Sequence, residues 1–426
     1  MADASYEVIL DWDCAVCVRR RCFDTTSSNT GHLTAAVVTL QTSLGRPISW
    51  FPCRHHIAEV VLTHIWNGLN IETPKSPDIS LFERFRHVFP YLENNSDTFA
   101  YLQCPNTLIQ FKRETLEFLD KVEKDNLVRD DYKEVVDLAK LFIMGKPDKS
   151  VTFRSPGALH KARWMAKLIY SIKIVLMKPH LDSVHKEMPV LNSNQFDLLV
   201  QFTMFSVYVY IPYWLKVHSL IKAPRYDLIF YKNLLEISSY NEIISSAGIG
   251  GFRNHLWYIH EETIGVSLFD EQVPNNDKKL IATKMLKEMK ASTADGWPQK
   301  RIGEGFGKPV MPELSADTKL ADLVGGDSIF LFRNLGLDLS FLKKPVSKWQ
   351  HDSSYMSNIE ILKGFKVVND LAERGVRLAH DFKNSARSEE NYQNILQTVE
   401  FSRSHIKKMR CKKSDMSWLL YTIKEF

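Results

Sequence analysis

The order of apolar and polar segments in residues 16–69 constrains the fold more than any other feature of this chain. Residues 16–23 and 48–52 are short apolar runs typical of strands, whereas residues 33–44 and 57–69 have the apolar spacing of helices. Gly45 is expected to end the first of these helices. A strand-helix-strand-helix order predicts two parallel strands joined by a crossover helix. The carboxyl ends of both strands should therefore lie at one edge of a sheet.

A polar cluster follows each predicted strand. Residues 22–31 read Cys-Phe-Asp-Thr-Thr-Ser-Ser-Asn-Thr-Gly, and residues 53–56 read Cys-Arg-His-His. A carboxylate at a strand end, here Asp24, is well placed for a metal ion, while the hydroxyl residues and Asn29 can cap the next helix. The alternative is that Asp24 is itself a cap or a turn residue. Two polar clusters at the same end of neighbouring strands indicate one active-site edge.

Composition limits the class of protein. The chain has 426 residues, 44% of them hydrophobic, which is enough for one large core or two cores. No run reaches about 18 uncharged apolar residues, so we expect no membrane span. The first ten residues lack the pattern of a signal peptide. The net charge of +5 permits a nucleic-acid partner without indicating one.

The cysteines fit a reducing compartment, because the six of them have no regular spacing. Cys53 and His56 form a Cys-x-x-His, and Cys14 and Cys17 form a Cys-x-x-Cys. A structural zinc site needs four ligands, and the chain offers no further pair at regular spacing. The sequence therefore does not favour zinc. The alternative is a buried cysteine and a hydrogen-bonded histidine at the start of a helix.

The remainder of the chain has mainly helical periodicity. The predicted helices cover residues 115–123, 132–144, 159–177, 196–220, 226–238, 254–269, 278–290, 359–382 and 390–406. Residues 292–318 are predicted to be a loop or linker, and residues 403–413 form a basic tail.

Two of these segments carry candidate chemistry. The helix at 159–177 is basic, and its Lys161, Arg163 and Trp164 have the character of a contact to phosphate and base. The alternative is that Trp164 belongs to a core. Glu373 lies in the late helix at 359–382, and Glu261 and Glu262 are the other acidic candidates.

Taken in order, these motifs resemble the hAT superfamily of DDE transposases, which are RNase H-like enzymes with a large helical insertion. The matching pieces are Asp24 with Asn29, residues 53–56, the pair Arg163-Trp164, and the Ala-Glu-Arg at residues 372–374. The resemblance implies an α-rich α/β fold with a partial RNase H-like sheet in residues 1–70. A helical insertion would occupy residues 71–350, and the late catalytic helix would return to the sheet within residues 351–426.

The resemblance also implies roles for individual residues. Asp24 would match the second catalytic carboxylate and Glu373 the third, and together they would bind Mg²⁺ or Mn²⁺. Cys53 and His56 would lie close to the active site. The chemistry would be metal-dependent hydrolysis and transesterification of DNA phosphodiesters by a nuclear protein. The implied contacts to transposon ends or to duplex DNA are Lys161, Arg163 and Trp164.

One departure from the family changes the expected function. In the family, three strands and the first catalytic Asp precede the segment that holds Asp24, whereas only 23 residues precede it here. Asp3, Asp11 and Asp13 are poor substitutes, because they lie just before the strand that ends at Asp24. The sequence thus predicts a truncated, catalytically inactive derivative. A sheet without those strands exposes an edge, which favours a partner chain such as a second copy.

Two alternatives stay open. One is a helical module that binds DNA or protein and has no catalytic role, suggested by the basic helix and the basic tail. The other is an unrelated helical scaffold in which Asp24 is a cap and Trp164 is core. The position of Asp24 relative to Glu373 distinguishes these alternatives from the transposase hypothesis.

Overall fold

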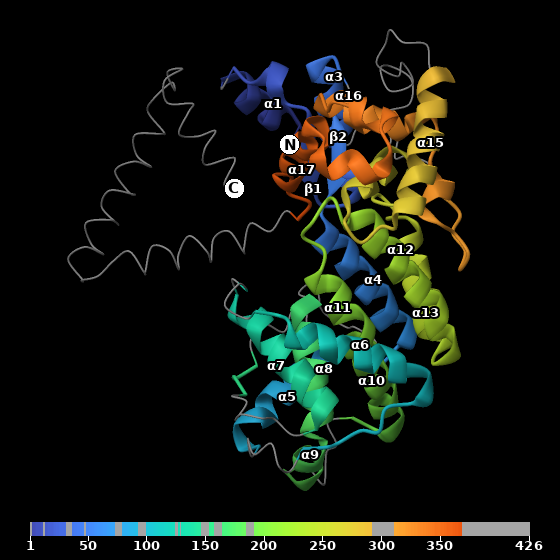
Figure 1. Cartoon of the computed structure of the whole chain (residues 1–426). Helices are drawn as coiled ribbons and strands as arrows, with labels where there is room; N and C mark the ends of the chain where they lie inside the picture. The colour runs from blue at the N-terminus through green and yellow to red at the C-terminus, as the bar shows by residue number, and fades with distance from the viewer. Residues whose placement is uncertain are drawn as a thin grey trace, which may run out of the picture. The chain divides into compact units, whose positions relative to one another are not determined.

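The computed structural model describes residues 2–11, 13–30, 36–46, 48–72, 79–92, 99–123, 127, 129–145, 153–156, 164–184, 191–291 and 311–368. It is an α-rich α/β structure with one small parallel sheet (Figure 1). The chain forms two compact units. We call Met1–His56, His218–Arg225 and Leu256–Phe426 the sheet unit, and Ile57–Val217 and Tyr226–His255 the helical unit.

Both predicted strands form, but the first is shorter than the expected residues 16–23, because Ala15–Cys17 form a 3₁₀ helix. β1 (Arg20–Phe23) pairs in parallel with β2 (Ser49–Pro52), with Arg20 opposite Ser49 and Phe23 opposite Pro52. The crossover contains the short α2 (Ser27–Thr30) and α3 (Ala36–Leu44), and α4 (Arg54–Leu69) starts one residue after β2. α3 ends before Gly45, whose φ of +64° suits glycine. The predicted strand-helix-strand-helix order and the parallel pairing are confirmed.

Buried amides fix the start of β2. Gln41 of α3 accepts hydrogen bonds at Oε1 from the Ile48 N–H at 3.0 Å and the Trp50 indole N–H at 3.2 Å. Asn334, which is 1% exposed, donates to the Arg19 carbonyl at 2.9 Å and to the Ser49 hydroxyl at 2.5 Å. These bonds satisfy polar groups that burial would otherwise leave unpaired.

The sheet unit also contains helices from both ends of the chain: α1 (Ala2–Asp11), α14 (Glu261–Ile264), α15 (Asn275–Ala291), α16 (Phe330–Leu335) and α17 (Ser353–Lys363). Short 3₁₀ helices connect them at Ala15–Cys17, Gly265–Phe269, Leu320–Leu323, Gly326–Ile329, Ser340–Lys343 and Val346–His351. Phe269, Phe341, Trp349 and Tyr355 pack their rings together, with centroids 5.0–5.5 Å apart. The described residues of 256–350 cluster with the sheet unit, and the expected insertion at residues 71–350 stays a prediction.

The helical unit is built from the remaining long segments. Its helices are most of α4, α5 (Ser80–Val88), α6 (Ile109–Asp120), α7 (Asp130–Met144), α8 (Trp164–Leu176), α9 (Lys178–Val184), α10 (Ser193–Phe205), α11 (Ile211–Leu215), most of α12 (Ala223–Glu236), and α13 (Glu242–Arg253). A π-helical turn, Ser206–Tyr210, joins α10 to α11. Short 3₁₀ turns lie at Phe89–Tyr91, Asn106–Leu108 and Ile237–Ser239.

Two predictions for individual helices were wrong. We expected a helix over residues 254–269, but this stretch holds turns, α14 and a 3₁₀ helix, whereas α13 precedes it. Three glycines weaken the helical signal of α13, and packing overrides it. A Cβ at Gly248 would lie 2.8 Å from a Leu234 methyl group and 3.2 Å from Ile65, so glycine permits the close approach of α13 to α4 (Figure 1).

The second wrong prediction concerns the late helix expected at residues 359–382. α17 ends at Lys363, and residues 364–368 are not helical. Gly364 follows the last turn of α17, and three residues later the Val367 carbonyl accepts a hydrogen bond from the Arg54 N–H at the start of α4. The rest of that predicted helix, the helix at 390–406 and the basic tail lie outside the described residues.

One apolar segment also has the length of a membrane span. Ser193–Leu215 reaches a mean hydropathy of 1.4 in its most apolar window, of which 78% is buried in the structure. It forms α10, the π-helical turn and α11 of the helical unit. Its apolar character is accounted for by its place in that core.

Candidate functional site at the sheet edge

The two polar clusters meet at the carboxyl edge of the sheet. The Cys53 N–H donates to the Phe23 carbonyl at 2.6 Å, which extends the ladder between β1 and β2 by one residue. Asp24 and Cys53 therefore leave neighbouring strands at the same level. This arrangement follows from parallel pairing, because both strands end at one side of the sheet.

Asp24 organises the turn after β1 with a single oxygen. Its Oδ1 accepts from the Thr26 N–H at 3.1 Å, from the Thr26 hydroxyl at 2.5 Å and from the Asn29 amide at 2.8 Å. We expected the hydroxyl residues to cap the helix and to leave the carboxylate unengaged, so that expectation was wrong for Oδ1. An Asp that accepts from the N–H two residues later stabilises this kind of turn. Oδ2 accepts no hydrogen bond from the described part of the chain.

The same contacts keep Asp24 ionised. Partial burial raises the pKa of its carboxyl, but the hydrogen bonds from Thr26 and Asn29 and the nearby His56 outweigh that effect. The pKa of Asp24 therefore lies below the usual value, and the carboxylate is charged at neutral pH. Asn29 is 5% exposed, so its amide is buried within this turn, where it donates to Asp24.

The second cluster is mostly buried. Cys53, Arg54 and His55 are each less than 7% exposed, whereas His56 is half-buried and acts electrostatically on Asp24. The Arg54 guanidinium lies 5.4 Å from the centre of the Tyr258 ring, and the Tyr258 hydroxyl donates to the Pro52 carbonyl at 2.6 Å. Of the Cys-x-x-His at residues 53–56, it is thus the histidine that interacts electrostatically with Asp24.

A third segment reaches this edge from far along the chain. The Arg54 N–H donates to the Val367 carbonyl at 2.9 Å, and the Phe365 ring lies 5.9 Å from Phe51. The Arg20 guanidinium lies 3.5 Å from the centre of the Phe365 ring. We call residues 364–368 the returning segment. The sequence pattern did not single out Tyr258, Phe365 or Val367, because nothing local identifies a contact across some 200 to 300 residues.

Of the three acidic candidates, Glu261 and Glu262 lie in the described residues and Glu373 does not. Glu373 comes six residues after Val367 and lies outside the described residues. Glu261 accepts the Asp327 N–H at Oε1 at 2.7 Å, and its carbonyl accepts from the Ser328 hydroxyl at 2.9 Å. Glu261 therefore holds the 3₁₀ turn at Gly326–Ile329. Glu262 is 7% exposed at the start of α14.

The predicted basic helix is a core helix where it is described. Lys161 and Arg163 lie outside the described residues, as does the side chain of Trp164, the first residue of α8. Lys167 and Lys173 add to the basic character of this segment in the sequence, but they are 2% and 0% exposed and form no basic surface. The Lys173 ammonium forms an ion pair with Glu134 at 2.6 Å, so Glu134 compensates its charge inside the helical unit.

The described residues provide one carboxylate for a metal at the sheet edge, Asp24 through Oδ2. Within the described ranges, no three His, Cys, Asp or Glu side chains are grouped so as to hold an ion. Sites with two metal ions take carboxylates from separate parts of a chain.

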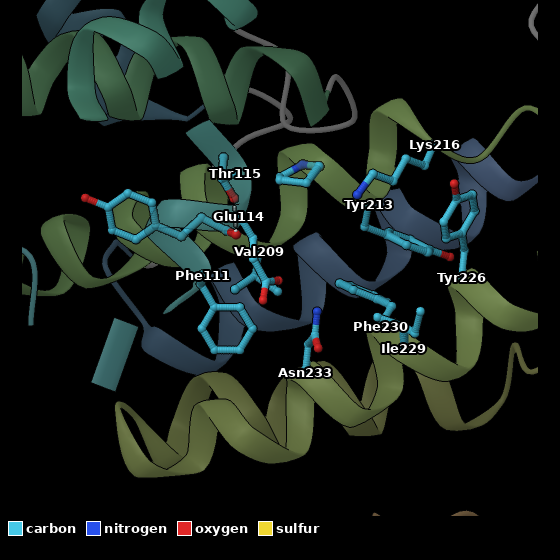
Figure 2. Close-up of a pocket in the computed structure, with 12 residues that line it drawn as sticks. Phe111, Glu114, Thr115, Val209, Tyr213, Lys216, Tyr226, Ile229, Phe230 and Asn233 are labelled. Atoms are coloured by element: carbon cyan, nitrogen blue, oxygen red, sulfur yellow. Dashed lines mark hydrogen bonds between the residues drawn. The ribbon is translucent and has the colours of Figure 1, made fainter. Parts of the chain in front are cut away.

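The helical unit has a pocket of its own, of about 90 Å³ (Figure 2). Tyr213 and Phe230 stack within it at 3.8 Å, and the Lys216 ammonium lies 5.8 Å from the centre of the Tyr226 ring. The Thr115 hydroxyl donates to the Tyr208 carbonyl of the π-helical turn at 2.7 Å. The lining residues are Phe111, Glu114, Thr115, Tyr208, Val209, Pro212, Tyr213, Lys216, Tyr226, Ile229, Phe230 and Asn233.

Replacing Thr115 by Val should destabilise the helical unit by about 1–2 kcal/mol, because Val keeps the shape but leaves the buried Tyr208 carbonyl unsatisfied. Urea unfolding followed by circular dichroism measures the change. Thr283→Val is the matched control. The Thr283 hydroxyl donates to the Lys279 carbonyl at an exposed position of α15, where water can replace the lost hydrogen bond. Equal effects of the two variants would contradict the assigned role of Thr115.

Comparison of the chain with protein-family models, with curated proteins and with solved structures finds no match.

Proposed function

We propose that this chain is a transposase-derived protein with an RNase H-like core, that it binds DNA in the nucleus, and that Asp24 and Glu373 bind a divalent metal ion. The observation that carries the proposal is the meeting of Asp24 and the Cys53-x-x-His56 motif at one edge of a parallel sheet. Parallel pairing brings any residues that follow these two strands to one edge, so the support lies in their chemistry: they are a carboxylate and a Cys-x-x-His.

The returning segment supports the role of Glu373. The Val367 carbonyl bonds Arg54 at the same edge, and Glu373 follows six residues later. Six residues span at most about 20 Å, so Glu373 is within reach of Asp24. The order of the units supports the proposal as well, because the helical unit lies in sequence between β2 and the returning segment.

Asp24 Oδ2 and a Glu373 carboxylate suit Mg²⁺ or Mn²⁺, which prefer oxygen ligands. When bound, such an ion polarises a phosphodiester. The proposal is of DNA binding with a metal site and does not include strand cleavage.

The proposed function is tested by DNA binding measured against salt. Fluorescence anisotropy with a labelled duplex should show an affinity that falls as salt rises. Lys161→Ala combined with Arg163→Ala should reduce the slope of log K against log salt by about 2 and lower the affinity at low salt.

The matched control removes the same charge elsewhere. Lys279 and Lys287 are exposed on α15, and replacing both by Ala should leave the slope within experimental error. Absence of binding at low salt would overturn the proposal, and equal loss in both double variants would show that only net charge matters.

A second candidate is a helical binding scaffold without metal. Two observations favour it: Oδ1 of Asp24 acts as a turn acceptor, and the described lysines of α8 are buried. This scaffold would bind DNA or protein, and its distinguishing result is protein that folds normally but shows no affinity for Mn²⁺.

A further inference from the structure

Two cysteines, Cys14 and Cys17, share a tight turn between α1 and β1. The Cys17 N–H donates to the Cys14 carbonyl at 2.8 Å, which closes a four-residue turn. Such a turn brings its end Cα atoms within about 7 Å of each other. Disulfides join Cα atoms about 4.4–6.8 Å apart, so the two thiols can be bridged with little movement of the backbone.

The two thiols differ in their surroundings. Cys17 is exposed, whereas Cys14 is half-buried and its thiol donates to the Ile9 carbonyl at 3.5 Å. Burial and the neighbouring Cys17 raise the pKa of the Cys14 thiol. A dissolved oxidant therefore meets Cys17 first, and Cys14 is the second thiol to react.

A cation lies beside the exposed thiol. The Arg46 guanidinium donates to the Ala15 carbonyl, inside the turn itself, and interacts electrostatically with Cys17. Exposure, turn geometry and charge thus coincide at one pair of cysteines.

We propose that Cys14 and Cys17 form a reversible redox pair that reacts with low-molecular-weight disulfides such as oxidised glutathione. The Cys17 thiolate attacks one sulfur of the disulfide, which forms a mixed disulfide and releases one thiolate. The Cys14 thiol then loses its proton to solvent and attacks the sulfur of Cys17, releasing the second thiolate. The protein dithiol is oxidised to a disulfide, and one glutathione disulfide is reduced to two glutathione thiols.

The test uses the full chain equilibrated in buffers of varied oxidised and reduced glutathione. After acid quenching and alkylation, trypsin releases residues 1–19 as a peptide that contains both cysteines and no others, because Arg19 is the first basic residue. Mass spectrometry then counts alkylated, glutathionylated and bridged forms. We expect this peptide to lose two hydrogens reversibly as the oxidised fraction rises.

Variants separate the two steps. Cys14→Ser should stop at a glutathione adduct on Cys17, and Cys17→Ser should cut adduct formation on this peptide at least several-fold. Cys104→Ser, which removes a half-buried cysteine elsewhere, should change neither reaction. A wild-type peptide that stays a dithiol, or that ends as a stable adduct without closing the bridge, would overturn the proposal.

Discussion

Replacing Lys173 by Met is expected to destabilise the helical unit by about 3–5 kcal/mol, the largest loss we expect from a single substitution. The Lys173 ammonium is fully buried, pairs with Glu134 at 2.6 Å and donates to the Arg154 carbonyl at 2.6 Å. Burial lowers the pKa of Lys173, and Glu134 opposes that shift. Removing the ammonium leaves a carboxylate and a carbonyl unsatisfied in an apolar interior.

Urea unfolding at neutral pH, followed by circular dichroism, measures this loss. Lys363→Met is the matched control, because Lys363 pairs with Glu360 at 2.9 Å on the surface, where both side chains are more than 60% exposed. We expect a change below about 0.5 kcal/mol there. Adding Glu134→Leu to Lys173→Met should recover much of the stability, since both charges are then gone. A loss at Lys173 no larger than at Lys363 would refute the role of the buried pair.

Asp24→Asn and Glu373→Gln should each weaken Mn²⁺ binding about tenfold or more, the largest functional effect that follows from the proposed metal site. Asn keeps the Oδ1 that accepts the hydrogen bonds from Thr26 and Asn29, so the turn after β1 is preserved while the charge is lost. The two effects should not add when the variants are combined, because either change removes a ligand of the same ion.

Electron paramagnetic resonance of free Mn²⁺ during titration measures the affinity, and circular dichroism confirms that each variant is folded. Glu360→Gln is the control, because it removes one exposed carboxylate from α17. The Glu360 carboxylate pairs with Lys363, which also lies on α17. Loss of affinity in Asp24→Asn with none in Glu373→Gln would exclude Glu373 as the partner of Asp24. Wild-type protein without measurable Mn²⁺ affinity would exclude the metal site altogether.

The sequence by itself determined the local features of the sheet edge. Apolar runs at residues 16–23 and 48–52, with helical spacing after each, predicted β1, α3, β2 and α4 in the correct order. Gly45 predicted the end of α3, since a positive φ favours glycine. A strand-helix-strand order favours a parallel pair joined by a crossover helix, so the amino-acid order was enough to predict that Asp24 meets residues 53–56.

Features set by distant contacts were decided only by the tertiary structure. Lys167 and Lys173 belong by periodicity to a basic helix, yet packing buries them and Glu134 compensates the charge of Lys173. Residues 364–368 continue a helical pattern, yet their backbone leaves the helix to bond Arg54. Local propensity is worth tenths of a kcal/mol per residue, whereas burial and long-range hydrogen bonds are worth more. Periodicity therefore predicted the elements of the sheet edge, and only packing determined that residues 364–368 return to it.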